Sequence, residues 1–232
     1  MSAAEALQAA VAAGPYFVWE PWTPHDGWRP LADLTDPAVI TERVAAAKAT
    51  LLGMTGLPEA AVPDRVIASV TFLGLASRLI SPPLGALVLA GTLPAPGIAD
   101  IWWRPVPGGP WPMACSSGAT GGDFVDVVVQ DLVTPVLQTF RDRYALSTQV
   151  LWGNVTSALA GAAGLLPVPA FEVVGAALAR PPLAGTGTLT RRGGRLQLVR
   201  HNCCLYYRIP GGGTCGDCVL THARSARRPT SG

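Results

Sequence analysis

The sequence predicts a mainly α fold, in which a helical body with small β-hairpins precedes a compact cysteine-rich module near the C-terminal end. Apolar residues recur at helical spacing through the middle of the chain. Four of the five cysteines fall within 16 residues near its end. At 232 residues, of which 49% are hydrophobic and 14% charged, the chain is long enough to bury a substantial core.

Six helices are expected from the apolar periodicity and from the prolines and glycines that mark helix ends. They cover about residues 36–52, 63–80, 82–90, 123–144, 147–166 and 170–179. Asp36 followed by Pro37 is a typical start, because aspartate caps a helix and proline fits its first turn. Ser81-Pro82 should end the second helix and begin the third, which should stop at Gly91. Pro135 should kink the fourth.

Two short hairpins complete the expected fold. Residues 101–106 favour a strand, residues 107–110 a turn, and residues 111–114 lead out of it as an irregular or edge partner, because prolines interrupt both sides. Near the end, residues 186–190 and 195–199 alternate around Gly193-Gly194 and predict a β-hairpin that leads into the cysteines.

The cysteines follow the pattern C-C-x10-C-x2-C at Cys203, Cys204, Cys215 and Cys218. Such closely spaced thiols favour a four-thiolate metal site. The C-x2-C pair suits a short turn, for which Gly216 gives the backbone freedom. Adjacent side chains on a strand point to opposite faces, so the Cys203-Cys204 pair requires a backbone bend if both bind metal. Adjacent cysteines are unusual for zinc, and the spacing indicates iron and sulfur.

Three alternatives to an iron–sulfur site remain open at this point. Structural zinc is the main one, since four thiolates also suit Zn²⁺. A disulfide pair is less favoured, because residues 1–14 do not look like a secretory signal and cytosolic thiols stay reduced. Inert buried cysteines are least favoured, because the four lie among Gly, Pro and Arg residues.

The segment HNCCLYYRIPGGGTCGDC, residues 201–218, strongly resembles the C-terminal signature of the FhuF-like ferric siderophore reductases. The similarity includes Tyr207-Arg208 and the Pro-Gly-Gly run before Cys215. Leu151-Trp152-Gly153-Asn154 is similar to an internal motif of the family. The resemblance implies that the four cysteines hold a [2Fe-2S] cluster, and it extends as a general helical layout over residues 36–180.

The resemblance implies an oxidoreductase that transfers one electron to Fe(III) held by a siderophore, with a hydroxamate as the expected chelate, and releases Fe(II). The electron donor would be of ferredoxin, flavodoxin or flavin reductase type. Two alternatives stay open. One is an iron–sulfur electron carrier without a substrate of its own. The other is a zinc-stabilised siderophore-binding or synthetase-like protein.

Four segments are expected on this basis. They are an N-terminal segment (1–35), a helical siderophore-binding body (36–184), a hairpin plus [2Fe-2S] cluster module (185–222) and a disordered tail (223–232). The module is too small to fold without its metal.

Candidate substrate-binding residues combine aromatic and basic side chains with residues of the internal motif: Trp102, Trp103, Arg104, Trp152, Asn154 and Arg208. The alternatives are ordinary packing for the tryptophans and a satisfied buried amide for Asn154. His201 adjoins the cysteines and is a candidate for tuning the cluster, or else an ordinary surface histidine. Cys115 is interpreted as a free structural thiol, because no histidine–acid pair is spaced near it.

Charge is unevenly distributed along the chain. The last 42 residues contain eight arginines and one acid, whereas the first 190 contain nine basic and fourteen acidic residues. A basic rim can attract an anionic partner. Nucleic-acid binding is not expected, because no recognition helix accompanies the arginines.

A cytoplasmic location is expected, with the inner face of the membrane left open. The most apolar stretch, residues 66–91, is interrupted by Arg78 and Pro82-Pro83, so it is expected to form two buried helices that are each too short to span a bilayer. Peripheral membrane contact stays compatible with the sequence.

Overall fold

The computed structural model describes residues 1–24, 27–106, 111–192 and 195–220. It confirms a mainly α fold with a few short strands. The helices are α1 (Ala3–Ala10), α2 (Pro37–Thr55), α3 (Asp64–Ala90), a π-helical segment (Val125–Val133), α4 (Thr134–Tyr144), α5 (Thr148–Ala163) and α6 (Pro169–Leu178). The strands are β1 (Glu20–Pro21), β2 (Arg29–Pro30), β3 (Ile101–Trp103), β4 (Met113–Cys115), β5 (Gly187–Arg192) and β6 (Arg195–Arg200).

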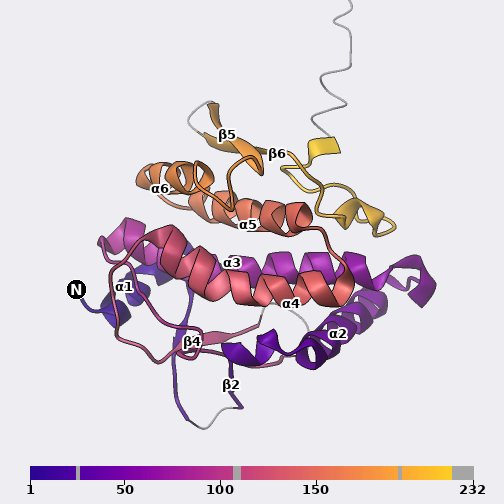
Figure 1. The fold of residues 1–232 in the computed structure, drawn as a ribbon, viewed down its shortest axis with the longest axis horizontal. Helices are drawn as coiled ribbons and strands as arrows, with labels where there is room; N and C mark the ends of the chain where they lie inside the picture. Colours follow the sequence, from indigo (N-terminus) through magenta and orange to yellow (C-terminus); the bar gives the residue numbers. More distant parts are fainter. Residues whose placement is uncertain (25–26, 107–110, 193–194, 221–232) are drawn as a thin grey trace, which may run out of the picture.

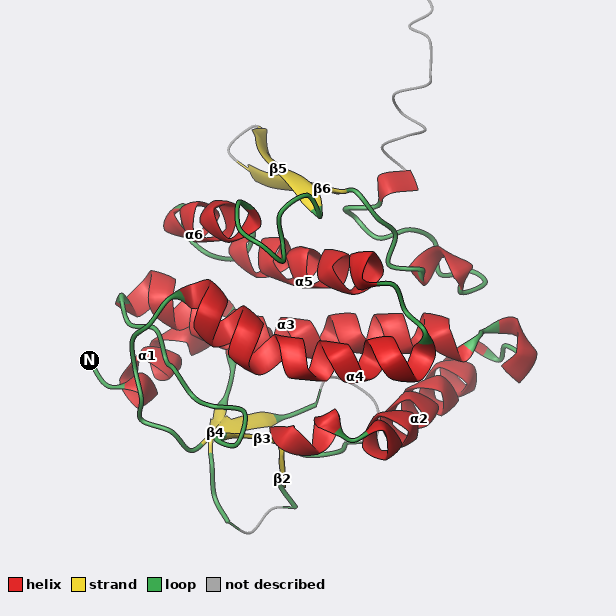
Figure 2. Ribbon diagram, viewed as in Figure 1, coloured by secondary structure: helices red, strands yellow, loops and turns green. Residues whose placement is uncertain are grey.

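Helix α3 runs through the centre of the molecule, beside α4 (Figure 1). Helices α5 and α6 and the β5–β6 hairpin lie on one side of this central pair, whereas α2 and the small sheet lie on the other (Figure 2). The sheet has the order β1-β4-β3-β2, with β1 parallel to β4 and the other pairs antiparallel. The cysteine module follows β6 and lies beside α5 and α3.

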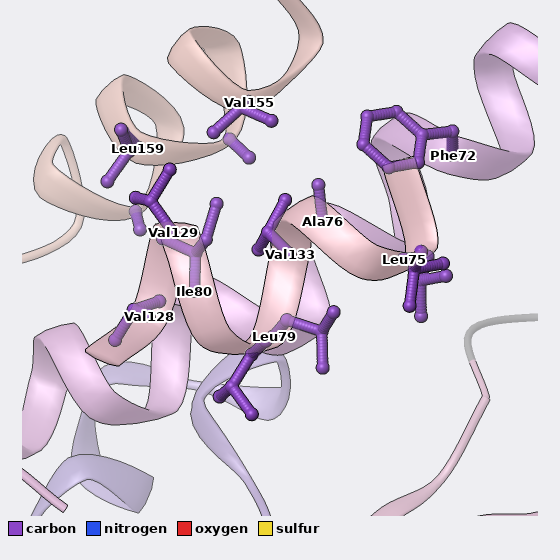
Figure 3. Packing of buried hydrophobic residues seen from close by; sticks show 14 of the residues in the cluster. Phe72, Leu75, Ala76, Leu79, Ile80, Val128, Val129, Val133, Val155 and Leu159 are labelled. Atoms are coloured by element: carbon purple, nitrogen blue, oxygen red, sulfur yellow. The ribbon is translucent and has the colours of Figure 1, made fainter. Parts of the chain in front are cut away.

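The hydrophobic core forms where the π-helical segment and α5 pack against α3. Figure 3 shows Phe72, Ala76 and Ile80 of α3 against the π-helical segment and α5. Val129 and Val133 come from the π-helical segment, and Val155 and Leu159 from α5; all are buried. This packing fixes α3 and α5 relative to each other, and both helices carry residues that support the cysteine module.

The expected break at Ser81-Pro82 is wrong, because α3 continues unbroken from Asp64 to Ala90. A proline at position 82 removes the backbone donor that would otherwise bind the carbonyl of Arg78. In this fold the indole N–H of Trp19 donates to that carbonyl at 3.0 Å. The N-terminal segment therefore supplies the missing hydrogen bond, and the helix ends at Gly91 as expected, in a left-handed conformation (φ 66°).

Arg78 also connects α3 to two loops. Its buried guanidinium donates to the carbonyl oxygens of Pro15 (2.6 Å), Val18 (3.0 Å) and Trp111 (3.2 Å). Removal from water lowers the pKa of this guanidinium, although it has three carbonyl acceptors. The N-terminal segment is thus attached to α3 in two ways. Trp19 donates a hydrogen bond to the Arg78 carbonyl, and the carbonyls of Pro15 and Val18 accept hydrogen bonds from the Arg78 side chain.

Several other elements agree with the sequence pattern, whereas α1, β1 and β2 lie in the N-terminal segment, where no element was predicted. Asp36 caps α2 and Ser147 caps α5 through their side-chain oxygens. The β5–β6 hairpin forms as expected, with its Gly193-Gly194 turn outside the described residues. A kink was expected at Pro135; the winding changes there from π to α, since α4 begins at Thr134. The 107–110 turn and the 223–232 tail lie outside the described residues, and the division into four segments stays a prediction.

Within the described residues, α3 is the one helix long and apolar enough to cross a membrane. In its most apolar window, however, 67% of the residues are buried inside the fold. The expectation that this stretch is buried is confirmed, while its division into two helices is not. A buried core helix gives no support to membrane association.

Replacing Trp19 by Phe should lower the free energy of unfolding by about 1–3 kcal/mol, because the Arg78 carbonyl is then buried without a donor. Chemical denaturation followed by the helical circular dichroism signal, at matched cluster content, measures this loss. Trp22→Phe is the matched control, since the indole N–H of Trp22 has no partner within the described residues. Equal losses in both variants would contradict a role for the Trp19 hydrogen bond.

Candidate metal centre

The four clustered cysteines lie on one short segment that follows β6, and all four are free thiols. Cys204 and Cys218 are buried, whereas Cys203 and Cys215 are partly exposed. The Sγ atoms of Cys204 and Cys215 are 3.5 Å apart, which is too long for a disulfide. The Cys218 amide donates to the Cys215 carbonyl at 3.2 Å, which closes the turn expected for the C-x2-C pair.

The backbone bends immediately after the adjacent cysteine pair. Leu205 has φ 67° and ψ −2°, a left-handed conformation that costs a non-glycine residue about 1–2 kcal/mol. The bend aims successive amides at the thiols: that of Leu205 donates to Cys203 Sγ at 3.4 Å, and that of Tyr206 donates to Cys204. Amide donors to sulfur tune the reduction potential of iron–sulfur sites. Local strain therefore gives the geometry that the adjacent pair requires.

The thiols differ in acidity. The contact with Cys215, ahead of the Tyr206 amide and the charge of Arg200, lowers the pKa of Cys204 to about 6 despite burial. The same contact raises the pKa of Cys215. Burial raises the pKa of Cys203. Metal ligands must be deprotonated, and one thiolate of the Cys204–Cys215 pair is stabilised by the other thiol before any metal binds.

The four thiols match the number of protein ligands that a [2Fe-2S] cluster takes. Among the described residues, no three Cys, His, Asp or Glu side chains are grouped so as to hold one metal ion. A [2Fe-2S] cluster takes two thiolates at each iron. Cys204 and Cys215 form one close pair of thiols, with their Sγ atoms 3.5 Å apart. When bound, the cluster would supply one-electron chemistry.

A chain of buried hydrogen bonds joins this segment to the body. Arg200 Nη2 donates to Asn154 Oδ1 at 2.8 Å, and Asn154 Nδ2 donates to the carbonyl (2.9 Å) and hydroxyl (3.1 Å) oxygens of Ser69. The Ser69 hydroxyl donates to the Cys204 carbonyl at 2.8 Å. Helices α3 and α5 thus hold the position of a cysteine carbonyl.

Gly153 is required for this contact. A Cβ atom at position 153 would overlap Asn202 Oδ1 and would lie 2.9 Å from Arg200 Nη2. Only glycine lets the β6 end and the first residues of the cysteine segment lie this close to α5. The Gly153-Asn154 part of the internal motif is therefore explained by what it contacts.

A second attachment involves the C-x2-C turn. The Ser157 hydroxyl of α5 donates to the Asp217 carboxylate, and the Arg200 amide donates to the Asp217 carbonyl at 3.3 Å. Asp217 lies between Cys215 and Cys218. Both ends of the cysteine segment are therefore tied to Arg200 and α5.

Four thiols on one short segment, with a backbone donor to sulfur, suit an iron–sulfur site. Residues 200–220 match the family model of the FhuF 2Fe-2S C-terminal domain, which confirms the resemblance over this segment and indicates a [2Fe-2S] cluster. No curated protein matches the chain. Residues 200–220 thus form a segment similar to the FhuF 2Fe-2S C-terminal domain, at the end of a helical body that the match does not cover.

The candidate substrate residues on β3 lie across α3 from α5 (Figure 2). Trp103 is fully buried, and its indole donates to the Pro30 carbonyl at 3.2 Å. Trp102 stacks on Trp22 with ring centroids 4.8 Å apart. Arg104 pairs with Glu20 at 3.6 Å. The structure gives these three residues contacts within the small sheet, and their part in substrate binding stays a prediction.

The other candidates lie near the module. Asn154 is fully buried and supports the Cys204 carbonyl through Ser69, whereas Trp152 is partly buried on α5. Arg208 is exposed, with its guanidinium 5.9 Å from the Tyr207 ring centroid. The six candidates are therefore divided between two regions.

The His201 ring forms its contacts at the β5–β6 hairpin, and Cys115 lies in the small sheet. The His201 ring contacts the Gly185 carbonyl (Nδ1, 2.9 Å) and the Thr188 hydroxyl (Nε2, 2.8 Å), so both ring nitrogens are engaged at the hairpin. Cys115 lies on β4, and burial raises the pKa of its thiol. An inert structural thiol is consistent with that environment.

Sequence reasoning missed a groove beside the module. A cavity of about 330 Å³ lies between α2 and α3, and Tyr206 and Ile209 of the module line one part of it. Arg43, Leu51, Met54, Ile67, Val70, Thr71 and Trp111 line other parts. A second cavity of about 310 Å³ shares Ala47, Thr71 and Trp111 with it and extends toward Arg78. We call the two together the α2–α3 groove. Met54, which lines this face, is 81% exposed.

Replacing any of Cys203, Cys204, Cys215 or Cys218 by Ser should bleach or destabilise the cluster, because each thiolate is expected to bind iron. Anaerobically purified wild-type protein should be reddish-brown with about two iron and two sulfide per chain. Cys115→Ser should leave the visible spectrum intact. Stoichiometric zinc without visible absorption would overturn the cluster assignment.

Gly153→Ala should reduce the iron and sulfide content after anaerobic reconstitution, because the added methyl displaces Asn202 and Arg200 from α5. The control is Gly161→Ala in the same helix, where a Cβ meets no atom within 4 Å. That variant should keep full cluster content and gain about 0.5–1 kcal/mol in unfolding free energy. Full cluster content in both variants would show that the close approach at Gly153 is dispensable.

Proposed function

We propose that this protein is a ferric siderophore reductase. The observation that carries the proposal is the α2–α3 groove, which is lined by the same segment that bears the cluster cysteines. Tyr206 belongs to both: its amide donates to the Cys204 thiol, and the residue lines the groove. A chelate held there would lie next to a cluster ligand, as short-range electron transfer requires.

The proposed reaction is a one-electron exchange. The reduced cluster loses one electron, Fe(III) in the chelate becomes Fe(II), and no bond within the siderophore breaks. Hydroxamate oxygens are hard ligands that hold Fe(III) tightly and Fe(II) far more weakly, so reduction is enough to release the metal. The protein's task is to bind the chelate and to hold its iron near the module.

The lining of the groove suits an organic chelate. Leu51, Ile67 and Val70 provide apolar contact for its backbone. Thr50 and Thr71 add hydroxyls, and Arg43 adds a cation at the same cavity. Such a mixture of apolar walls and few polar groups is typical of small-molecule sites. An electron carrier without its own substrate would not need this groove beside its module.

Re-reduction needs a separate donor. We propose a donor of ferredoxin, flavodoxin or flavin reductase type, approaching the exposed side of the module near Arg208. Partly exposed Cys203 and Cys215 bring the module's sulfur atoms toward solvent, which suits electron entry from a protein partner.

Chemically reduced protein, mixed anaerobically with a ferric hydroxamate, should reoxidise and deliver Fe(II) to a ferrous chelator. The rate should saturate with siderophore concentration, because binding in the groove precedes electron transfer. Stopped-flow absorbance of the cluster measures the rate. If the reduced protein stays reduced beside every ferric siderophore tried, yet passes electrons to a partner protein, the carrier alternative holds.

Filling the groove should weaken chelate binding without altering the cluster. Ala46 is exposed on α2 and lines the groove, so Ala46→Trp should raise the half-saturating siderophore concentration about tenfold, equivalent to ~1.4 kcal/mol. Ala45→Trp is the matched control, because the neighbouring residue faces a different cavity, between α2 and Arg143. Identical saturation curves for the two variants would place the chelate elsewhere.

A further inference from the structure

Arg200 is a buried cation without a carboxylate partner. Its side chain is only 1% exposed, and within the described residues it forms no ion pair. Of its guanidinium nitrogens only Nη2 donates to a protein acceptor, the amide oxygen of Asn154, while Nε and Nη1 have no partner among the described residues. A buried charge in this state is costly unless an opposite charge compensates it.

Asp217, the one acidic residue between positions 200 and 220, is engaged elsewhere. Asp217 contacts Arg200 only through the backbone, by its carbonyl oxygen. Its carboxylate accepts the hydroxyl of Ser157 instead. Arg200 is joined to both halves of the cysteine segment, through Asn154 and Ser69 to the Cys204 carbonyl and through its own amide to the C-x2-C turn.

The partner that orients Arg200 is neutral, and its orientation is fixed. Asn154 uses its NH₂ group to donate to both oxygens of Ser69, which leaves its carbonyl oxygen facing Arg200. A carboxylate at position 154 would also accept from Arg200, but it would cancel the charge. The amide holds the guanidinium in place and leaves its charge intact.

A cluster bound by four thiolates carries net negative charge, which grows by one on reduction. A fixed cation nearby stabilises the reduced form more than the oxidised form, and so raises the reduction potential. We propose that Arg200 is the fixed counter-charge of the [2Fe-2S] cluster and that, held by Asn154, it raises the cluster's reduction potential. This inference rests on the cluster and not on the identity of the substrate.

The test is a potentiometric titration of cluster-loaded protein, followed by visible absorbance and by the electron paramagnetic resonance of the reduced cluster. Arg200→Gln removes the charge and keeps donor groups. Asn154→Asp keeps an acceptor for Arg200 and adds the missing carboxylate, although it removes the donor to the Ser69 carbonyl. Both should lower the potential, by about tenfold in the reduction equilibrium, which is ~59 mV for one electron. Arg200→Lys, which keeps the charge, should stay close to wild type.

The control is Arg191→Gln, because Arg191 lies on the same hairpin but is exposed, 5.1 Å from the Phe171 ring centroid. Its potential should equal that of wild type. Unchanged potentials in cluster-loaded Arg200→Gln and Asn154→Asp would overturn the proposal. A merely structural role would lower cluster content without shifting the potential of the clusters that form.

Variants that fail to assemble a cluster also test the counter-charge proposal. If Arg200→Gln and Asn154→Asp cannot assemble a cluster but Arg200→Lys can, the positive charge itself is required, which supports the counter-charge role. If Arg200→Lys also fails, the shape of the guanidinium matters and the proposal is wrong. Failure of siderophore reduction alone would leave these potentials unaffected, so the two proposals are tested separately.

Discussion

The hydrogen-bonded chain from Arg200 through Asn154 and Ser69 to the Cys204 carbonyl is the contact on which the arrangement of the module depends. It joins three parts of the chain that are far apart in sequence: β6, α5 and α3. A fully buried network of this kind fixes one geometry, because each unsatisfied member would be costly. The cysteine segment is therefore positioned by the body and not only by its own turns.

The continuity of α3 extends this constraint to the groove. Ser69 supports the cysteine segment, while Ile67 and Thr71, two residues to either side, line the groove. Further along the same helix, Arg78 holds Trp111, another lining residue, through its carbonyl oxygen. A single rigid helix thus sets the distance between the metal centre and the cavity. If α3 broke at Pro82, its C-terminal end would no longer be aligned with the part of the helix that lines the groove. The Trp19 indole opposes such a break by donating to the Arg78 carbonyl.

The sequence was sufficient for features that depend on local chemistry. The cysteine spacing, the caps at Asp36 and Ser147 and the final hairpin follow from neighbouring residues. It was insufficient where distant residues compensate for one another. A proline pair predicts a helix break, unless the carbonyl of Arg78 gains a donor from an indole 59 residues earlier in the chain.

The groove escaped prediction for a related reason. Its lining consists of ordinary core-type residues from α2, α3 and the module, which no spacing rule brings together. Aromatic and basic clusters such as Trp102, Trp103 and Arg104 are more conspicuous in a sequence, yet Trp103 is buried and Arg104 is paired with Glu20. The aromatic and basic residue types suggested a binding surface near β3. The packing of the helices instead leaves the open space between α2 and α3.

A buried cation beside the cluster has opposite effects on the two halves of the proposed reaction. By raising the reduction potential, Arg200 eases electron entry from the donor and reduces the driving force toward Fe(III). The smaller driving force is compensated when Fe(II) leaves the chelate. Hard oxygen ligands bind Fe(II) weakly, so its release pulls the electron transfer toward product. A neutral residue such as Asn154 in contact with the guanidinium fits this balance, since it positions the charge without removing it.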